Sequence, residues 1–292
     1  MQRSLLKDKF LKMKIIINAD DLGLSYEVNK AIETAIIGKK ISSSTILANG
    51  MAFDDAIRIS KEYPNISYGV HLNLIEFRPL TNLEVFDSYN LINNQGNFVE
   101  GSVFCIKEFT LELKNAIYEE WMAQINKIKN TGILISHIDS HQHTHGIDDL
   151  KDVLSKVIYD SGVTKIRRQS NSSMLEMYLI RKNKFKVQLN NTTIRSLPKK
   201  NFLIRRLNQL INSVRHYLWI KQFKNQVTLT DAFISYGNYI YLFSNYYKWY
   251  HFDTIELMCH PGHKDYEHET ESVMADKLSC YVDYQMITYN EL

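Results

Sequence analysis

Cysteine is scarce in this sequence, with three residues among 292. Cys105, Cys259 and Cys280 are too few and too far apart for a disulfide framework or a thiolate metal site. We therefore expect reduced and mostly buried thiols. Internal repeats and low-complexity tracts are also absent, and 45% hydrophobic with 23% charged residues is typical of a globular protein with a sizeable core.

A long apolar run is missing from the N-terminal stretch, where five charged residues lie between positions 1 and 12. Such a stretch offers neither the core of a signal peptide nor a membrane span. We therefore expect a cytoplasmic protein without a membrane span. Residues 1–12 are interpreted as an N-terminal extension, and the domain is expected to begin at Met13.

Acidic residues are missing between Glu176 and Asp231, while twelve Lys and Arg lie from Arg181 to Lys224. The net charge of +3 hides this asymmetry. A basic block of this kind indicates either a polyanion-binding surface or the solvated face of added helices. Apolar residues within it repeat at helical spacing, at Leu203, Leu207, Leu210, Val214 and Leu218. We favour a basic helical insertion over residues 181–226 and expect no nucleic-acid partner.

Apolar β-branched runs alternate with amphipathic stretches along the chain, a pattern typical of strand and helix units around a parallel sheet. Strands are expected near residues 14–18, 44–49, 68–72, 134–138, 164–167, 232–235, 254–259 and 285–288. Helices are expected over residues 25–37, 53–62, 109–129, 148–159 and 268–283. Residues 73–103 are interpreted as a loop insertion. The pattern predicts a single α/β domain over residues 13–292, a TIM-like (β/α) barrel that is complete, incomplete or distorted.

Polar residues gather at the carboxyl ends of these strands, where barrel enzymes build their sites. Asp20 and Asp21 follow the first strand, His71 lies in the third, and Arg167 ends the fifth. Adjacent carboxylates repel each other unless a cation or a shared proton offsets the cost. One of the two can bind a metal while the other serves as a base. For the pair by itself, a turn or a helix N-cap is the alternative.

Four histidines and Asp139 lie between residues 137 and 145, after the fourth strand. His71 alone would be an ordinary core histidine, whereas so dense a cluster is difficult to explain by structure alone. Alternate side chains of an extended segment point to opposite faces, so only some of these histidines reach one metal. Two imidazoles and one carboxylate with open positions form a catalytic ligand set. The sequence therefore predicts a divalent-metal site and a hydrolase.

Four segments closely resemble the YdjC-like carbohydrate deacetylases, which include chitooligosaccharide and hopanoid-pathway deacetylases. They read NADDLGLS at 18–25, GVHLNL at 69–74, HIDSHQHTH at 137–145 and MCHPG at 258–262. Residues 43–45, 49–51 and 166–167 match in the same order. Leu22 stands where the family has phenylalanine, and the proline that commonly follows the histidine cluster is missing at 146–147.

The resemblance implies a (β/α) barrel whose metal is held by Asp21, His71 and His141. The metal would be Mg²⁺, with Zn²⁺ or another transition metal as the alternative. It further implies that Asp20 is the general base and His260 the general acid, with Arg167 as a third catalytic residue. Residues that contact substrate or support the metal ligands are then Asn49, Asn73, Asp139, His143 and His145.

The activity implied is removal of an acetyl group from an N-acetylated sugar, with release of acetate. The sugar would be an amino sugar, a chitooligosaccharide or a glycoconjugate, and a homodimer is left open. Two alternatives remain from the residues themselves. One is metal-dependent hydrolysis of another bond, a phosphodiester or a different amide, on the same barrel. The other is a polyanion-binding protein with an idle site.

Overall fold

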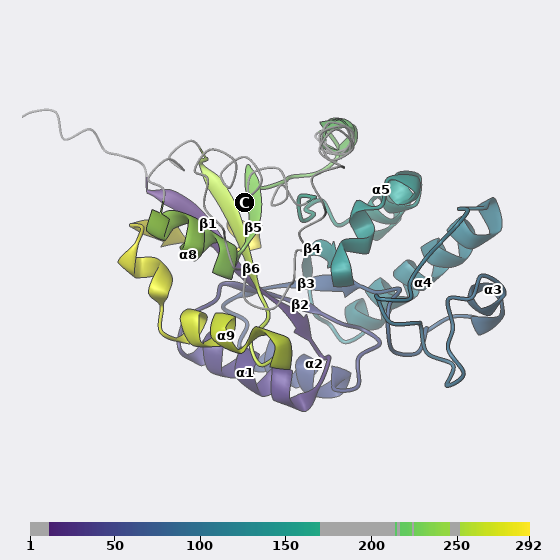
Figure 1. Cartoon of the computed structure of the whole chain (residues 1–292), viewed down its shortest axis with the longest axis horizontal. Coiled ribbons are helices and arrows are strands. Elements are labelled where there is room, and N and C mark those ends of the chain that lie inside the picture. The colour runs from purple at the N-terminus through teal and green to yellow at the C-terminus, as the bar shows by residue number, and fades with distance from the viewer. Residues whose placement is uncertain (1–11, 170–213, 215–216, 224, 246–251) are drawn as a thin grey trace, which may run out of the picture.

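The computed structural model describes residues 12–169, 214, 217–223, 225–245 and 252–292 (Figure 1). Its strands are β1 (Met13–Leu22), β2 (Ser43–Ile46), β3 (Ser67–Leu72), β4 (Ile135–Ser140), β5 (Ala232–Ser235), β6 (Thr254–Cys259) and β7 (Tyr284–Met286). Its α-helices are α1 (Tyr26–Ile37), α2 (Phe53–Glu62), α3 (Leu83–Ser88), α4 (Leu111–Lys129), α5 (Lys151–Ser161), α8 (Tyr236–Asn245) and α9 (Glu267–Met274).

The strands form one parallel sheet in the order β4-β3-β2-β1-β6-β5, with β7 paired to the start of β1. Strand β1 is central, since Asn18 pairs with Ser43 of β2 on one side and with Met258 of β6 on the other. Helices surround the sheet in Figure 1, with α1 and α2 packed together and α4 packed against α5. The carboxyl ends of the strands therefore meet at one edge, as a site on this fold requires.

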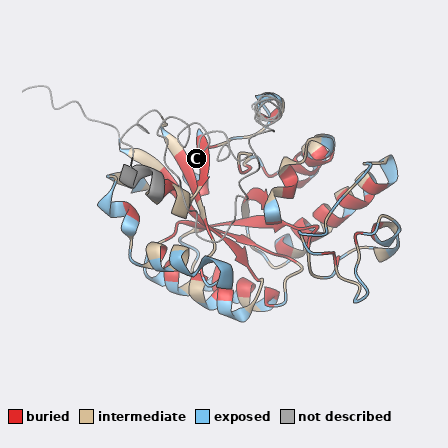
Figure 2. Cartoon of the chain, viewed as in Figure 1, coloured by how far each residue is buried: buried red, intermediate tan, exposed pale blue. Residues whose placement is uncertain are grey.

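Local sequence signals explain where the helices begin and end. Ser25 accepts a hydrogen bond from the backbone N–H of Val28, and Thr110 does the same for α4 through Leu113. Helix α5 ends at Gly162, whose φ of 70° is the left-handed conformation that glycine adopts without cost. Figure 2 shows the central strands almost wholly buried, so side chains on both faces of the sheet are shielded from solvent.

The expected α/β class and parallel sheet are confirmed, and within the described residues the sheet forms a half-barrel. The segment expected as a strand at 164–167 makes only isolated parallel bridges, Ile138 with Ile166 and Lys165 with Thr228. A single bridge on each side is too short a ladder to form a strand. Of the complete, incomplete or distorted barrels that the pattern allowed, the complete one is therefore not confirmed in the described part of the chain.

Three local expectations need correction. The loop expected at 73–103 contains helix α3, whose Phe86 is buried and whose first turn is capped by Asn82. The helix expected at 268–283 breaks at Asp276, where φ is 51°, and continues as a 3-10 turn, Lys277–Cys280. The thiols were expected to be mostly buried, but Cys105 and Cys280 are exposed because they lie in a loop and in this turn.

Two expected segments fall mainly outside the described residues, namely the extension at 1–12 and the basic insertion at 181–226. In the described part of the insertion, residues 217–223 are helical, with Trp219 and Phe223 fully buried. None of the helices described here is both long enough and apolar enough to cross a membrane.

Candidate metal centre

The adjacent carboxylates of Asp20 and Asp21 are both buried at the end of β1. Neighbouring side chains of a regular strand point to opposite faces. Here the register against β2 shifts between Ala19 and Leu22, and Asp21 has a φ of 69°. Aspartate tolerates this left-handed conformation better than most residues. Because the alternation is broken, Asp21 lies beside His71 and His141 while Asp20 lies in a second group with His71 and Asp139.

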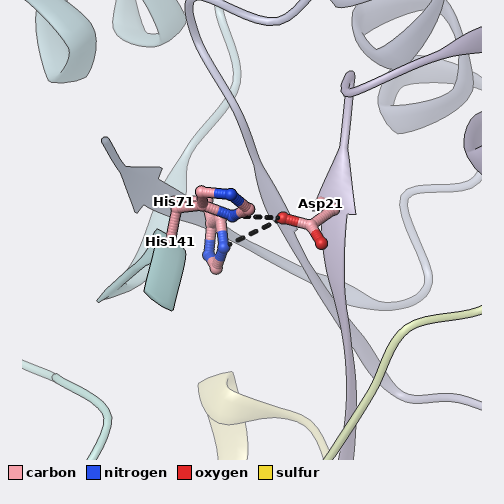
Figure 3. A group of neighbouring side chains, drawn as sticks. All are labelled: Asp21, His71 and His141. Carbon is pink, nitrogen blue, oxygen red and sulfur yellow. Dashed lines mark hydrogen bonds and ion pairs between the residues drawn. The ribbon is translucent and has the colours of Figure 1, made fainter. Parts of the chain in front are cut away.

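Asp21, His71 and His141 converge from three segments of the sheet edge (Figure 3). Oδ1 of Asp21 lies 3.2 Å from Nε2 of His71 and 2.9 Å from Nδ1 of His141. All three side chains are buried. Their donor atoms lie within 4.8 Å of one another, so a single ion could contact all three.

The chemistry of this group fits a divalent cation. Two imidazoles and one carboxylate are ligands that zinc and other catalytic divalent metals accept. Burial alone would lower the pKa of His71, but the Asp139 and Asp21 carboxylates outweigh burial and raise that pKa to about 10. The His141 imidazole also keeps a buried Nε2 without a hydrogen-bond partner among the described residues. Positive charge is therefore favoured at this point.

A second group, Asp20, His71 and Asp139, also lies within reach of one ion. Its carboxylates are already engaged, because Arg167 contacts Asp20 through Nη1 and Nη2 at 2.7 and 2.6 Å and Asp139 through Nη1 at 2.8 Å. Burial favours a neutral Asp20, yet the Arg167 guanidinium outweighs it and holds the pKa of Asp20 well below its usual value. The group with Asp21 is thus the better candidate for a cation.

Asp139 fixes the orientation of His71. Its Oδ1 lies 2.7 Å from Nδ1 of His71, and its Oδ2 accepts a hydrogen bond of 3.0 Å from the Thr45 hydroxyl. A carboxylate on the far nitrogen of a metal-binding histidine sets the tautomer and the ring orientation. Nε2 of His71 is therefore the nitrogen directed at Asp21.

His260 lies after β6, where Glu269 and Tyr266 hold its ring. Glu269 accepts a hydrogen bond of 2.8 Å from the His260 backbone N–H and lies 3.3 Å from Nδ1. The ring stacks on Tyr266, with centroids 4.3 Å apart. Burial would lower the pKa of His260, but Glu269, Asp20 and Asp21 outweigh burial and raise it. The imidazole is thus held in one orientation, and the raised pKa favours its protonated form.

The remaining predicted residues have other partners. Asn73 donates to the Asn49 side chain, and Asn49 donates to the backbone of Arg78, so this pair secures the segment that follows β3. His145 lies against Ser140, and burial lowers its pKa well below the usual value. Burial likewise lowers the pKa of His143 to about 3, so both rings are neutral at physiological pH. Among the described residues, no hydrogen bond connects Asn49, Asn73, His143 or His145 to the side chains of Asp21, His71 and His141.

Sequence reasoning missed Glu256 and Glu269. Glu256 is fully buried on β6, and burial raises its pKa to about 7 although Arg167 opposes the shift. A lone carboxylate inside the apolar segment Ile255–Cys259 was the available signal, since an unpaired buried charge is costly. Glu269 lies in the first turn of a helix, where an acidic residue is ordinary, so nothing in the sequence distinguished it.

The sequence model described as YdjC-like protein matches residues 14–292. A carbohydrate deacetylase from Oceanobacillus iheyensis is 35% identical over 145 residues, which are 50% of this chain and 60% of that protein. One from Halalkalibacterium halodurans is 36% identical over 146 residues, with the same shares of the two chains. The chain thus spans about 60% of the length of these curated relatives.

Among solved structures, the chain resembles a protein from Enterococcus faecalis that is described as a candidate cellobiose-phosphate cleavage protein. The TM-score is 0.68, and the match covers 96% of this chain and 98% of the other. Because the identity is only 19%, this likeness shows a shared fold and does not extend to activity.

Proposed function

Because the chain belongs to the YdjC-like protein family, we propose that it is a metal-dependent carbohydrate deacetylase that hydrolyses the acetamide of an N-acetylated sugar. The observation that carries this proposal is the buried group of Asp21, His71 and His141 beside a second, Arg167-bound carboxylate. A binding module has no need of such a pair of carboxylates.

The cation would be held by Asp21, His71 and His141. Mg²⁺ is the ion that the family resemblance implies, whereas the two imidazoles also suit Zn²⁺ or another transition metal. When bound, the cation supplies a positive charge that acidifies water and polarises the acetamide carbonyl. Asp139 keeps the His71 ring directed toward that position. Each ligand side chain is buried, so few competing waters reach the group.

Asp20 is proposed as the general base. Arg167 keeps it ionised, and each carboxylate oxygen has more than one lone pair, so Oδ2 can still accept a proton while it contacts Nη1. A carboxylate with a lowered pKa is a weak base in isolation. It can act here because the water that it deprotonates is itself acidified.

His260 is proposed as the general acid. Because Nδ1 faces Glu269, Nε2 is the nitrogen left to donate a proton to the departing sugar amine. Water attacks the acetamide carbon, and a C–O bond forms while Asp20 takes the proton of the water. The tetrahedral intermediate then collapses, the C–N bond breaks as the amine takes the proton from His260, and acetate and the free amino sugar leave. Arg167 is proposed as a residue that holds Asp20, since carboxylates occupy its donors.

The test measures acetate release from N-acetylglucosamine and from chitooligosaccharides, with and without a chelator. We expect release that the chelator abolishes and that added Mg²⁺ restores. Asp20→Asn should lose most of its activity, while His268→Ala, a change at an exposed histidine, should keep full activity as the control.

The other outcomes identify the alternatives. Chelator-sensitive cleavage of a phosphodiester or of a different amide, without acetate, would favour hydrolysis of another bond. Inactivity on every substrate, together with salt-sensitive nucleic-acid binding, would favour the polyanion-binding protein. The cytoplasmic location, the homodimer and the single domain over residues 13–292 stay predictions.

A further inference from the structure

Glu256 and Tyr289 form a buried support beneath Arg167. One carboxylate oxygen of Glu256, Oε1, lies 2.8 Å from Nε and 2.7 Å from Nη2 of Arg167. The other oxygen, Oε2, accepts a hydrogen bond from the Tyr289 hydroxyl. Glu256, Arg167 and Tyr289 are all completely buried. Glu256 therefore connects the guanidinium to the C-terminal segment of the described chain.

The contacts of Arg167 use its whole hydrogen-bonding capacity. A guanidinium has five N–H donors in a planar fork. Nε faces Glu256, Nη2 faces Glu256 and Asp20, and Nη1 faces Asp20 and Asp139. The carboxylates of Glu256, Asp20 and Asp139 thus lie along the edge of the guanidinium, where its N–H groups point. If the guanidinium of Arg167 rotated away from Glu256, its contacts with Asp20 and Asp139 would change together.

Tyr289 is held independently of Glu256. Its ring stacks on His137 with centroids 3.5 Å apart and planes inclined by 9°. Its backbone N–H donates to the Ser67 hydroxyl at 3.0 Å, and its carbonyl accepts a hydrogen bond from Lys165. The phenol oxygen is therefore a fixed point from which the Glu256 carboxylate is oriented.

We propose that Glu256 and Tyr289 are positioning residues that hold Arg167 so that Asp20 and Asp139 keep their places together. Asp139 in turn orients His71, so the same support sets the proposed base and a proposed metal ligand. The part that concerns turnover rests on the proposed deacetylase function. The part that concerns metal affinity rests on the proposed ligands Asp21, His71 and His141 and on the contacts described above, but not on the activity.

Tyr289→Phe is the sharpest variant, because it removes one hydroxyl and leaves the ring stacked on His137. Its matched control is Tyr68→Phe, which also deletes a phenol hydrogen bond, 2.8 Å from the carbonyl of Tyr63. Tyr68 is nearly as buried but has no contact with the Arg167 fork. Both changes should lower the thermal midpoint, and Tyr289→Phe should lower it more because its hydrogen bond is to a carboxylate.

The two variants should differ in metal affinity and in turnover. Zn²⁺ is the probe in a calorimetric titration of the purified protein, and we expect Tyr289→Phe to bind it about tenfold more weakly. In the acetate assay kcat should fall about fivefold with KM unchanged, as for the loss of one hydrogen bond that orients reacting groups. Tyr68→Phe should change neither quantity by more than about twofold.

Glu256→Gln is the second variant, since it keeps the shape of the side chain and removes its charge. It should reduce Zn²⁺ affinity and kcat further than Tyr289→Phe does, and Glu256→Asp should restore part of both. If Glu256→Gln does not fold, Tyr289→Phe still tests the positioning role.

Unchanged Zn²⁺ affinity and kcat in Tyr289→Phe, with only a lower thermal midpoint, would overturn the proposal and leave a structural role. If the unaltered protein releases no acetate, the proposed function fails. The Zn²⁺ titration then still tests the positioning role separately.

Discussion

Replacing Asp20 by asparagine separates metal binding from chemistry. The amide keeps the shape of the side chain but cannot accept the proton of an attacking water. General acid–base catalysis by one group contributes about 10²–10⁴ in rate, which corresponds to about 3–5.5 kcal/mol of the barrier. We therefore expect kcat to fall by about that factor. The metal should remain, because Asp21, His71 and His141 are untouched.

Asp20→Asn should also lower the free energy of unfolding, and the hydrogen bonds of Asp20 indicate by how much. Asp20 forms two charge-assisted hydrogen bonds to Arg167, at 2.6 and 2.7 Å, and accepts a third at 2.8 Å from Asn18. Arg167 keeps Asp139 and Glu256, so no unpaired buried charge is left. A loss of about 1.5–3 kcal/mol is expected, the range for a hydrogen bond to a charged group.

The pH dependence of that stability has a definite sign. The folded protein holds the pKa of Asp20 below its unfolded value of about 3.9, so the carboxylate stabilises the fold above that pH. The contribution disappears as the pH falls toward the folded pKa. The asparagine variant should lose this acid-side dependence, which urea denaturation between about pH 5 and pH 2 measures.

Metal analysis and acetate release on the same purified sample complete the test. A variant that holds metal and turns over at a near-normal rate would show that another group takes the proton. A variant that loses the metal would instead point to the group of Asp20, His71 and Asp139 as the binding site.

Three further predictions address the ligands, the acid and the fold. His141→Ala should lose metal and turnover together with its circular dichroism unchanged, and full metal occupancy would contradict the ligand assignment. Glu269→Gln should lower the pKa of His260, so the alkaline limb of the kcat/KM profile, where a protonated acid is lost, should move to lower pH; an unmoved limb would assign it to another group. Gly262→Ala should destabilise by about 1–3 kcal/mol in urea, because φ is 80° and the new Cβ would lie 2.6 Å from a side chain of α1.

The regular elements were largely predictable because their signals are local. Helix α2 has the bounds that its period predicts, 53–62, and β6 has those of its apolar run. Helix α3 was missed because six residues are too short for a periodic signal. The segment at 164–167 has the composition of a strand, but its extent depends on partners distant in sequence.

The candidate site was likewise predictable only in part. Polar residues were expected to gather at one edge because parallel strands end there, and the family resemblance singled out Asp21, His71 and His141 among them. The structure brings Asp21 within hydrogen-bond distance of both histidines. Their assignment as metal ligands stays a prediction. The partners that hold Arg167 and His260 could not be predicted, since Glu256 and Glu269 acquire their roles only when β6 and α9 pack against the rest of the sheet.

The central position of β1 has a consequence for synthesis on the ribosome. Lys14 of β1 pairs with Thr254 of β6, 240 residues later, which at about 5–20 residues per second is roughly 12–48 s of translation. Until then β1 presents an open edge with its apolar side chains, and such edges attract other chains. Arg167 likewise emerges before Glu256 does. We therefore expect nascent chains that stop before β6 to depend on chaperones and to aggregate when released, whereas release after Tyr289 should permit folding.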